Sequence, residues 1–347
     1  MSITNKNHLF TLNIMASSMS VAWIVLLAII IVALDCNPSL FVYNKIFPPP
    51  DCPSCPSDFR GKTVWITGAT SGIGRELATV LGTIHRANLI ISGRREDELK
   101  KLRDYITSYE PSVKVKVLPF DQTGNDEVVL TAVEEAVKGG KIDLLVLNAG
   151  RSQRLPALST PISATRELTK LNFESQVLIA QSVIDKSGWS AASPGHIFVT
   201  SSVAGKLPVA LSSSYAASKA ALNSYFQSLR SELPWLRVDL SLPGPVATPI
   251  AKQAITYEGK TGTTNEKDEV KMSVERCVAL MISQMSGPEF LMYESWISTQ
   301  PALFFTMLGQ YMPTLVAKLA KIVGPQRMKA FDGGEDLFKF SDWLLKK

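Results

Sequence analysis

The chain has 347 residues, and 46% of them are hydrophobic, which is enough to bury a substantial core in one large domain or two ordinary ones. Its net charge of +5 is modest, and lysines and arginines are scattered among acidic residues without a long basic run, so nucleic-acid binding is not expected. Four cysteines are too few for a disulfide framework, and no cluster of Cys and His has the spacing of a zinc site, so no metal is expected.

The first distinctive feature along the chain is an apolar segment near the N-terminus. Val21 to Leu34 reads VAWIVLLAIIIVAL without a charged residue, and extension back to Ile14 adds only small residues, Met and serines. About twenty residues that rise 1.5 Å each cross the roughly 30 Å core of a bilayer. A cleaved signal peptide is the competing interpretation, but Asp35 stands where the small residues of a cleavage site are expected. We therefore expect an N-terminal segment, residues 1–36, that contains an uncleaved single-pass membrane anchor at about 14–34.

A Pro-rich spacer is expected at residues 37–60, where the sequence reads FPPPDCPSCPSDFR at its end. Cys52 and Cys55 lie in this stretch. Zinc requires four ligands, and no second pair accompanies them. The pair is expected to be functionally silent or to form a local disulfide.

After the spacer, short apolar segments of strand length alternate with segments of helical length, such as Arg95 to Tyr109 and Glu127 to Lys138. This alternation predicts an α/β fold, a Rossmann-type doubly wound parallel sheet in a single domain, with ligands bound outside the carboxyl ends of the strands. The expected strands are KTVWIT, ANLIIS, VKVKVLP, DLLVLN, HIFVTS and RVDLSL.

The first expected strand runs into a glycine-rich turn, TGATSGIGREL. Gly68, Gly72 and Gly74 allow a tight turn and a close approach of the backbone to a pyrophosphate. The helix expected to start near Ile73 adds a positive N-terminus beside that group. A dinucleotide is therefore the expected ligand of this turn.

The end of the second expected strand, SGRRED, bears on the choice of dinucleotide. Arg94 and Arg95 suit the 2′-phosphate of NADP(H), the expected cofactor. The alternative is that both arginines are solvated and that Glu96 or Asp97 binds the ribose of NAD. Asp121, after the third strand, is placed to bind the adenine or to make a turn.

The stretch SSSYAASKAALNSYF places Tyr215 and Lys219 four residues apart, and so on one face of a helix. A cation beside a phenol lowers the pKa of that phenol toward neutrality, so Tyr215 could act as a general acid or base. Such a pair occurs by chance about once in a chain of this length, and it decides nothing alone. Ser202 stands thirteen residues before Tyr215, at the end of the fifth strand.

Five motifs occur together in this order: TGATSGIG, NAG, SS, YAASK and PGPVATP. In this the chain resembles the short-chain dehydrogenase/reductase family over Gly61 to Ile250, and the family domain is expected at residues 61–300. Leu147 departs from the pattern, because many members have Asn before NAG.

The resemblance implies roles for individual residues. Tyr215 would exchange the proton, Ser202 would hold the substrate oxygen, Lys219 would lower the pKa of Tyr215 and bind the nicotinamide ribose, and Asn172 would hold a relay water. The resemblance and the turn chemistry together imply these cofactor contacts: Gly68, Ser71, Gly72, Ile73, Gly74, Arg94, Arg95, Asp121, Asn148, Ala149, Gly150, Tyr215, Lys219, Pro243, Gly244, Val246 and Thr248.

The residues beyond 300 form an expected helical extension, 301–347, in which Leu303 to Val323 is unusually apolar. Pro313 and two lysines argue against a full membrane span, and a membrane contact, packing on the main domain or a dimer interface all stay open. Family members commonly form dimers through the helices that include Tyr215 to Leu233, so a homodimer is implied.

The motifs MSVERCV, WISTQPALFF, QYMP and KAFDGG, with the anchor, resemble one membrane-bound subgroup of the family, located in the endoplasmic reticulum. That subgroup is associated with NADPH-dependent reduction of steroids, retinoids and other carbonyl compounds. The function expected from the sequence is therefore reduction of hydrophobic carbonyl substrates. The alternatives are a lipid-pathway reductase of the ketosphingoid type and a catalytically idle scaffold that binds NADPH.

Overall fold

The structure is a computed structural model of the 347-residue chain. It describes residues 35–36, 38–46, 59–250, 253–257, 271–289 and 293–333. The predicted anchor at about 14–34 and the pair Cys52 and Cys55 lie outside the described residues. None of the helices within these ranges is both long and apolar enough to cross a bilayer.

The centre of the fold is a parallel sheet of seven strands in the order β3-β2-β1-β4-β5-β6-β7. The strand order reverses between β1 and β4, which opens a crevice for a ligand at the carboxyl ends of these strands. The predicted Rossmann-type sheet is thus confirmed. The strands are β1 (Thr63–Thr67), β2 (Asn88–Gly93), β3 (Val115–Pro119), β4 (Leu144–Leu147), β5 (His196–Thr200), β6 (Arg237–Pro243) and β7 (Glu294–Ile297).

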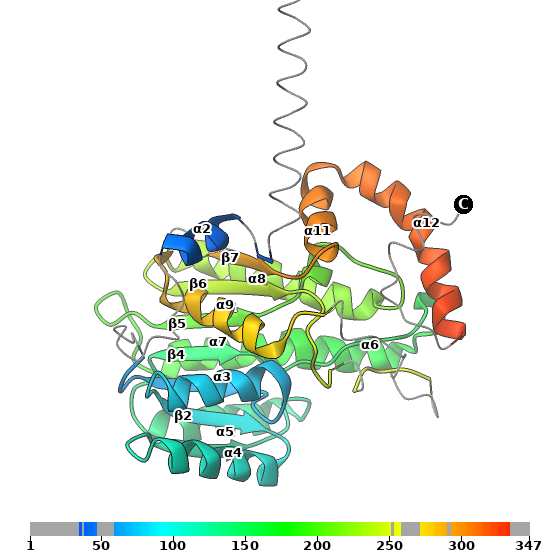
Figure 1. The fold of residues 1–347 in the computed structure, drawn as a ribbon. Coiled ribbons are helices and arrows are strands. Elements are labelled where there is room, and N and C mark those ends of the chain that lie inside the picture. Colours follow the sequence, from blue (N-terminus) through cyan, green and yellow to red (C-terminus); the bar gives the residue numbers. More distant parts are fainter. Residues whose placement is uncertain are drawn as a thin grey trace, which may run out of the picture.

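Helices cover both faces of the sheet (Figure 1). One face is packed by α2 (Pro38–Ile46), α3 (Gly72–Thr83), α4 (Glu96–Tyr109) and α9 (Val274–Ser286). The other is packed by α5 (Asp126–Lys138), α7 (Ser175–Lys186) and α8 (Ser213–Glu232). Shorter elements are η1 (Ala157–Ser159), α6 (Ile162–Thr169), the π-helical η2 (Lys170–Glu174) and η3 (Val203–Gly205).

The central strands β1, β2 and β4 are largely apolar because they are buried on both faces. In β1, Val64 and Ile66 belong to the core under α3 and α4, while Trp65 belongs to the core under α5 and α7. All three side chains are completely buried. The period-2 alternation of a strand therefore supplies both cores from one short segment.

The beginning of the predicted spacer is folded, which the sequence did not indicate. Its residues 38–46 form α2, where Leu40 is fully buried in the core beside α9. Before it, Asp35 forms an ion pair with Arg276 at 2.7 Å, and Cys36 makes a β-bridge with Ile297. Apolar side chains at Cys36 and Leu40 explain the difference, because the Pro-rich composition begins only after them.

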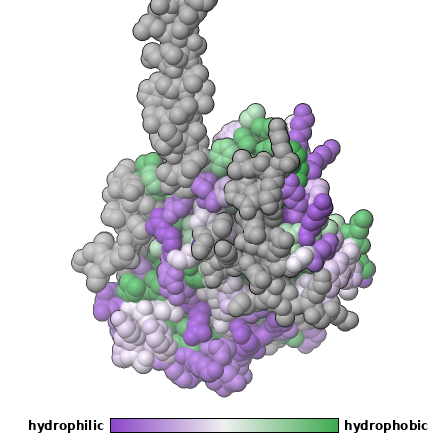
Figure 2. Space-filling view, turned by 45° about the vertical axis from the view of Figure 1, so that its right-hand side comes forward, coloured by the Kyte–Doolittle hydropathy of each residue, from purple (hydrophilic) through white to green (hydrophobic). Residues whose placement is uncertain are grey.

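The C-terminal extension forms two helices, α11 (Ala302–Tyr311) and α12 (Pro313–Asp332), as predicted. In Figure 1, α11 and the start of α12 lie on the same upper side of the molecule as α2 and β7, and the rest of α12 descends along the right-hand side to the height of α6. The far end of α12 packs on the segment before α8, where Arg327 Nε donates a hydrogen bond to the carbonyl of Ala210 at 3.2 Å. Hydrophobic residues gather at the top of the described surface beside hydrophilic ones, at the height of the α11–α12 junction (Figure 2).

Candidate active site

A cavity of about 440 Å³ lies at the carboxyl ends of the strands and extends to α11 and α12. It gathers residues from Gly68 to Arg327, and most of the predicted site residues line it. These are Gly68, Ser71, Gly72, Ile73, Arg94, Asp121, Asn148, Ala149, Gly150, Ser202, Tyr215, Lys219, Pro243, Gly244, Val246 and Thr248. Three predicted residues, Gly74, Arg95 and Asn172, are absent from its wall.

The turn after β1 requires glycine for two different reasons. Gly68 has φ +69°, and a Cβ there would lie 2.8 Å from Cα of Ala149. Gly74 is buried behind the wall, where a Cβ would lie 2.4 Å from the carbonyl oxygen of Gly68. Ser71, the N-cap of α3, makes no side-chain hydrogen bond to the helix, so it leaves the N–H groups of the first turn for another acceptor. A pyrophosphate fits this arrangement of close backbone and helix N-terminus.

The two arginines after β2 are separated in the structure. Arg94 lines the cavity. Arg95 turns away, and its Nη2 donates hydrogen bonds to the carbonyl oxygen and to Oγ1 of Thr70, at 3.2 and 3.0 Å. Arg94 is thus the arginine placed for a cofactor phosphate, and Arg95 braces the glycine-rich turn.

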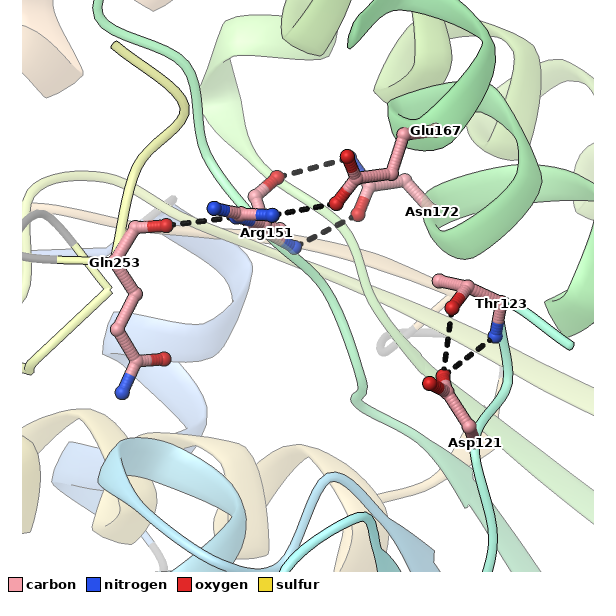
Figure 3. A network of polar contacts seen from close by, with 6 residues as sticks. All are labelled: Asp121, Thr123, Arg151, Glu167, Asn172 and Gln253. Carbon is pink, nitrogen blue, oxygen red and sulfur yellow. Dashed lines mark hydrogen bonds and ion pairs between the residues drawn. The ribbon is translucent and has the colours of Figure 1, made fainter. Parts of the chain in front are cut away.

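Asp121 makes the turn that was one of its two predicted roles. Its Oδ1 accepts hydrogen bonds from N and Oγ1 of Thr123, at 2.9 and 2.8 Å, so it makes a turn (Figure 3). The residue also lines the cavity. The turn holds it beside the place where an adenine would lie, and a direct contact to adenine stays a prediction.

The NAG motif joins the ends of β4 and β1. Thr67 Oγ1 accepts hydrogen bonds from the backbone N–H groups of Asn148 and Ala149, at 2.9 and 3.2 Å. Asn148 Nδ2 donates in return to the carbonyl oxygen of Thr67 at 3.1 Å. These bonds pull the two strand ends together at the switch point, where Gly68 and Ala149 must touch.

Ser202, Tyr215 and Lys219 meet at the wall opposite the glycine-rich turn. Ser202 follows β5, and its Oγ accepts a hydrogen bond from the N–H of Ala204 at 3.1 Å. Tyr215 and Lys219 come from the first turns of α8. Lys219 is almost fully buried and donates from Nζ to the carbonyl oxygen of Thr200 at 3.0 Å.

The electrostatics of this group differ from the expectation in one respect. Burial raises the pKa of Tyr215, while a hydrogen bond to Ser202 and the positive charge of Arg154 lower it. Burial lowers the pKa of Lys219 from 10.5 to about 8. The positive charge of Arg154 thus lowers the pKa of Tyr215, which the sequence did not indicate, and the expected effect of Lys219 on Tyr215 stays a prediction.

Asn172 lies in the π-helical segment η2, completely buried behind the cavity wall. Its Oδ1 accepts from the N–H of Arg151 at 2.9 Å, and its Nδ2 donates to the carbonyl of Arg151 at 3.0 Å (Figure 3). Its Nδ2 also donates to Ser218 Oγ at 3.0 Å. Ser218 Oγ donates in turn to the carbonyl of Tyr215 at 2.8 Å. Asn172 thus connects the loop after β4 with the catalytic helix, and its role in proton relay stays a prediction.

One positioning residue was missed in the sequence. Gln153 is fully buried, and its Oε1 accepts hydrogen bonds from the backbone N–H groups of Ser214 and Tyr215, at 2.9 and 3.1 Å. Its Nε2 donates to Thr160 Oγ1 at 2.7 Å. Ser212, the N-cap of α8, makes no side-chain hydrogen bond to the helix, so Gln153 performs the capping from a distant loop. No local pattern in the sequence could have indicated a cap that lies some sixty residues away.

The opposite end of the cavity is closed by the C-terminal extension. Its side chains at this wall are mostly apolar, and in α12 they recur at helical spacing. They are Ala302, Phe305, Thr306, Val316, Leu319, Ala320, Val323 and Arg327. Several apolar side chains of Leu303 to Val323 thus face the cavity. This agrees with packing on the main domain, one of the alternatives left open by the sequence.

Comparison with known proteins places this geometry in context. A family model described as short chain dehydrogenase matches residues 62–258. Dehydrogenase/reductase SDR family member 7 of Mus musculus is 38% identical over 79% of this chain and 81% of its own length, and that of Homo sapiens is 36% identical over 79% and 80%. This is the subgroup that the motifs of the C-terminal region indicated.

A solved structure agrees in fold. The short-chain dehydrogenase from Sphingobium yanoikuyae in complex with NADPH is 26% identical, with a TM-score of 0.59. The alignment covers 74% of this chain and 95% of that one.

Proposed function

The chain belongs to the short-chain dehydrogenase/reductase family and is an oxidoreductase, and from this premise we propose that it reduces carbonyl groups of hydrophobic substrates with NADPH. The observation that carries the proposal is the meeting of Ser202, Tyr215 and Lys219 at the wall of a cavity whose other end is apolar. A carbonyl oxygen at Ser202 and Tyr215 would place the rest of its molecule toward α11 and α12.

NADPH rather than NADH is supported by Arg94, the arginine on the cavity wall after β2. The similar enzyme from Sphingobium yanoikuyae was solved in complex with NADPH. The glycine-rich turn, with Ser71 and Ile73 beside it, would hold the pyrophosphate. Val246 and Thr248 would hold the nicotinamide end.

In the proposed reaction a ketone or aldehyde oxygen accepts hydrogen bonds from the hydroxyl groups of Ser202 and Tyr215. Tyr215 transfers its proton to this oxygen as negative charge develops there. Lys219 lies one helical turn away and binds the ribose of the cofactor. Bound NADPH supplies the hydride that the carbonyl carbon receives, so the product is an alcohol.

The substrate class follows from the apolar wall and from the resemblance to family member 7. Steroid, retinoid and xenobiotic carbonyls are the proposed substrates, and a ketosphingoid base is the alternative. The predicted anchor at about 14–34 would hold the enzyme in the membrane of the endoplasmic reticulum, where such compounds partition. A homodimer through the helices that include Tyr215 to Leu233 belongs to the same proposal.

The test is NADPH oxidation by the detergent-solubilised full chain with steroid, retinoid, sphingoid and small aromatic carbonyls. Tyr215→Phe removes the proton donor and is expected to lower kcat by about 100-fold or more, with NADPH still bound. Tyr225→Phe is the matched control, because Tyr225 lies on the same helix and its hydroxyl group bonds to Gln181 at 3.0 Å, away from the cavity. Equal activity of the two variants would exclude Tyr215 as the acid. Bound NADPH with no carbonyl reduced would favour the idle scaffold.

A further inference from the structure

Among the described residues, four exposed hydrophobic side chains lie close together in the sequence around the start of α12. Tyr311, Met312, Leu315 and Ile322 are 82, 49, 39 and 54% exposed, and all four lie in the last residue of α11, the α11–α12 junction and the first half of α12. We call these four residues with Lys318 the outer face. Single exposed apolar residues are ordinary, but a contiguous group marks an interaction surface.

The outer face is a continuous stripe because of helical periodicity. Leu315 and Ile322 are seven residues apart, close to two turns, and Lys318 lies between them at three and four residues. Val316, Val323 and Arg327 point to the cavity instead. The same helix thus walls the cavity with one side and exposes Leu315, Lys318 and Ile322 on another.

The charge of this region is predominantly positive, because α12 carries three lysines and Arg327 against one acid, Asp332, at its last residue. Residues 302–331 contain Lys318, Lys321, Arg327 and Lys329 but no aspartate or glutamate. Lys318 and Lys321 are exposed next to the apolar stripe. Apolar side chains flanked by lysines are the composition of a helix that lies in the headgroup region of an anionic bilayer, where the lysine ammonium groups reach the phosphates.

The described chain begins beside α11. The carbonyl of Asp35 accepts a hydrogen bond from the N–H of Ser298 at 3.0 Å, and Cys36 forms its β-bridge with Ile297. The predicted anchor ends at residue 34, and α11 begins at Ala302, a few residues after this contact. An anchor leaving the domain at this point would bring a bilayer to the side on which α2, β7 and α11 lie (Figure 1).

From these observations we infer that the outer face docks in the plane of an anionic lipid bilayer and holds α12, the wall of the cavity, at the membrane surface. The docking itself does not depend on the reaction. Its consequence, that apolar carbonyl substrates reach the cavity from the bilayer, rests on the proposed function.

The experiment measures where the outer face lies in the full chain inserted in vesicles. A fluorescent label is attached at Tyr311→Cys or Ile322→Cys, and at Tyr109→Cys as the control, because Tyr109 is a tyrosine 70% exposed at the end of α4. Cys52 and Cys55 are replaced by serine, and Cys36 and Cys277 are fully buried. Spin-labelled phosphatidylcholine quenches labels in the bilayer, and iodide quenches labels in water.

The labels at 311 and 322 are expected to be quenched by the lipid and the label at 109 by iodide. Phosphatidylserine is expected to strengthen the lipid quenching, and Lys318→Gln and Lys321→Gln each to lower the docked-to-undocked ratio about fivefold. Iodide quenching at 311 and 322 equal to that at 109 would overturn the inference. Protection from iodide without quenching by lipid would also overturn it, since a second copy of the chain would then cover the face.

These readouts need no substrate. Lipid quenching at 311 and 322 without any NADPH oxidation would leave the docking standing and count against the proposed function. NADPH oxidation with an undocked outer face would support the proposed function and overturn the docking.

Discussion

The two ends of the cavity are built in different ways. The cofactor end is formed by backbone and short side chains in turns that follow β1, β4 and β6, with glycines where the chain approaches itself. The end proposed for the substrate, called the substrate end below, is formed by larger side chains on α11 and α12, two helices that follow the sheet in the sequence. The first end tolerates little change in backbone, whereas the second can change its shape by exchange of single side chains.

The largest expected effect is at the glycines of the cofactor end. Gly74→Ala would place Cβ at 2.4 Å from both the carbonyl oxygen of Gly68 and Nδ2 of Asn148. We expect the free energy of unfolding to fall by about 2 kcal/mol or more, and NADPH binding to be lost or greatly weakened, because the turn must move. Denaturant unfolding and NADPH titration measure the two effects.

Gly324→Ala is the matched control at the substrate end. Gly324 also lines the cavity, but a Cβ there meets nothing within 4 Å. It lies inside α12 but directly before Pro325, whose ring crowds a Cβ on the preceding residue, so alanine is expected to change the free energy of unfolding by less than about 1 kcal/mol. If both alanines destabilised the protein equally, the contrast between the two ends would be wrong.

The next effect separates the two arginines after β2. Arg94→Ala is expected to weaken NADPH binding by about 10-fold to 100-fold and to leave NADH binding unchanged, because only NADPH carries the phosphate that this charge would bind. Arg95→Ala, which removes the hydrogen bonds to Thr70, is expected to affect both cofactors alike and more weakly. If the preference for NADPH over NADH changed more in Arg95→Ala than in Arg94→Ala, Arg95 would be the residue that binds the phosphate. Titration with both cofactors measures it.

A smaller effect is expected at Gln153, the buried residue that caps the N-terminus of α8. Gln153→Leu leaves the N–H groups of Ser214 and Tyr215 without their acceptor, and kcat is expected to fall about tenfold while NADPH binding persists. The pH dependence of kcat should also shift, since the Tyr215 hydroxyl group moves. Gln153→Glu keeps the acceptor oxygen and should recover part of kcat. Loss of NADPH binding in parallel with kcat would point to general unfolding instead.

The smallest effect belongs to the substrate end. Val316→Phe extends a cavity-facing side chain and is expected to raise KM for the bulkiest carbonyls by about threefold to tenfold, with little change for small aldehydes or NADPH. Leu315→Phe is the control, because the neighbouring side chain is 39% exposed on the outer face. An equal change in KM from both variants would show that the α12 wall does not select substrates.

Much of the fold was predictable because its signals are local. Each strand of the sheet but the short β7 was expected within about two residues, since a strand buried on both faces is an apolar run bounded by turn residues. The glycine-rich turn and the spacing of Tyr215 and Lys219 are likewise local. The helix α2 was not predicted, because its burial depends on contacts with α9, more than two hundred residues later.

The sequence by itself determined the sheet, the cofactor turn and the membership in the family, because strand length, glycine positions and helical spacing act between near neighbours. Only the tertiary structure decided which of Arg94 and Arg95 faces the cavity, that Gln153 caps α8, that the charge of Arg154 reaches Tyr215, and that α12 closes the substrate end. Each of these depends on the direction in which a side chain points or on the distance between segments that are remote in the sequence. They arise when the sheet brings the ends of its strands to one edge, and no pattern along the chain encodes them separately.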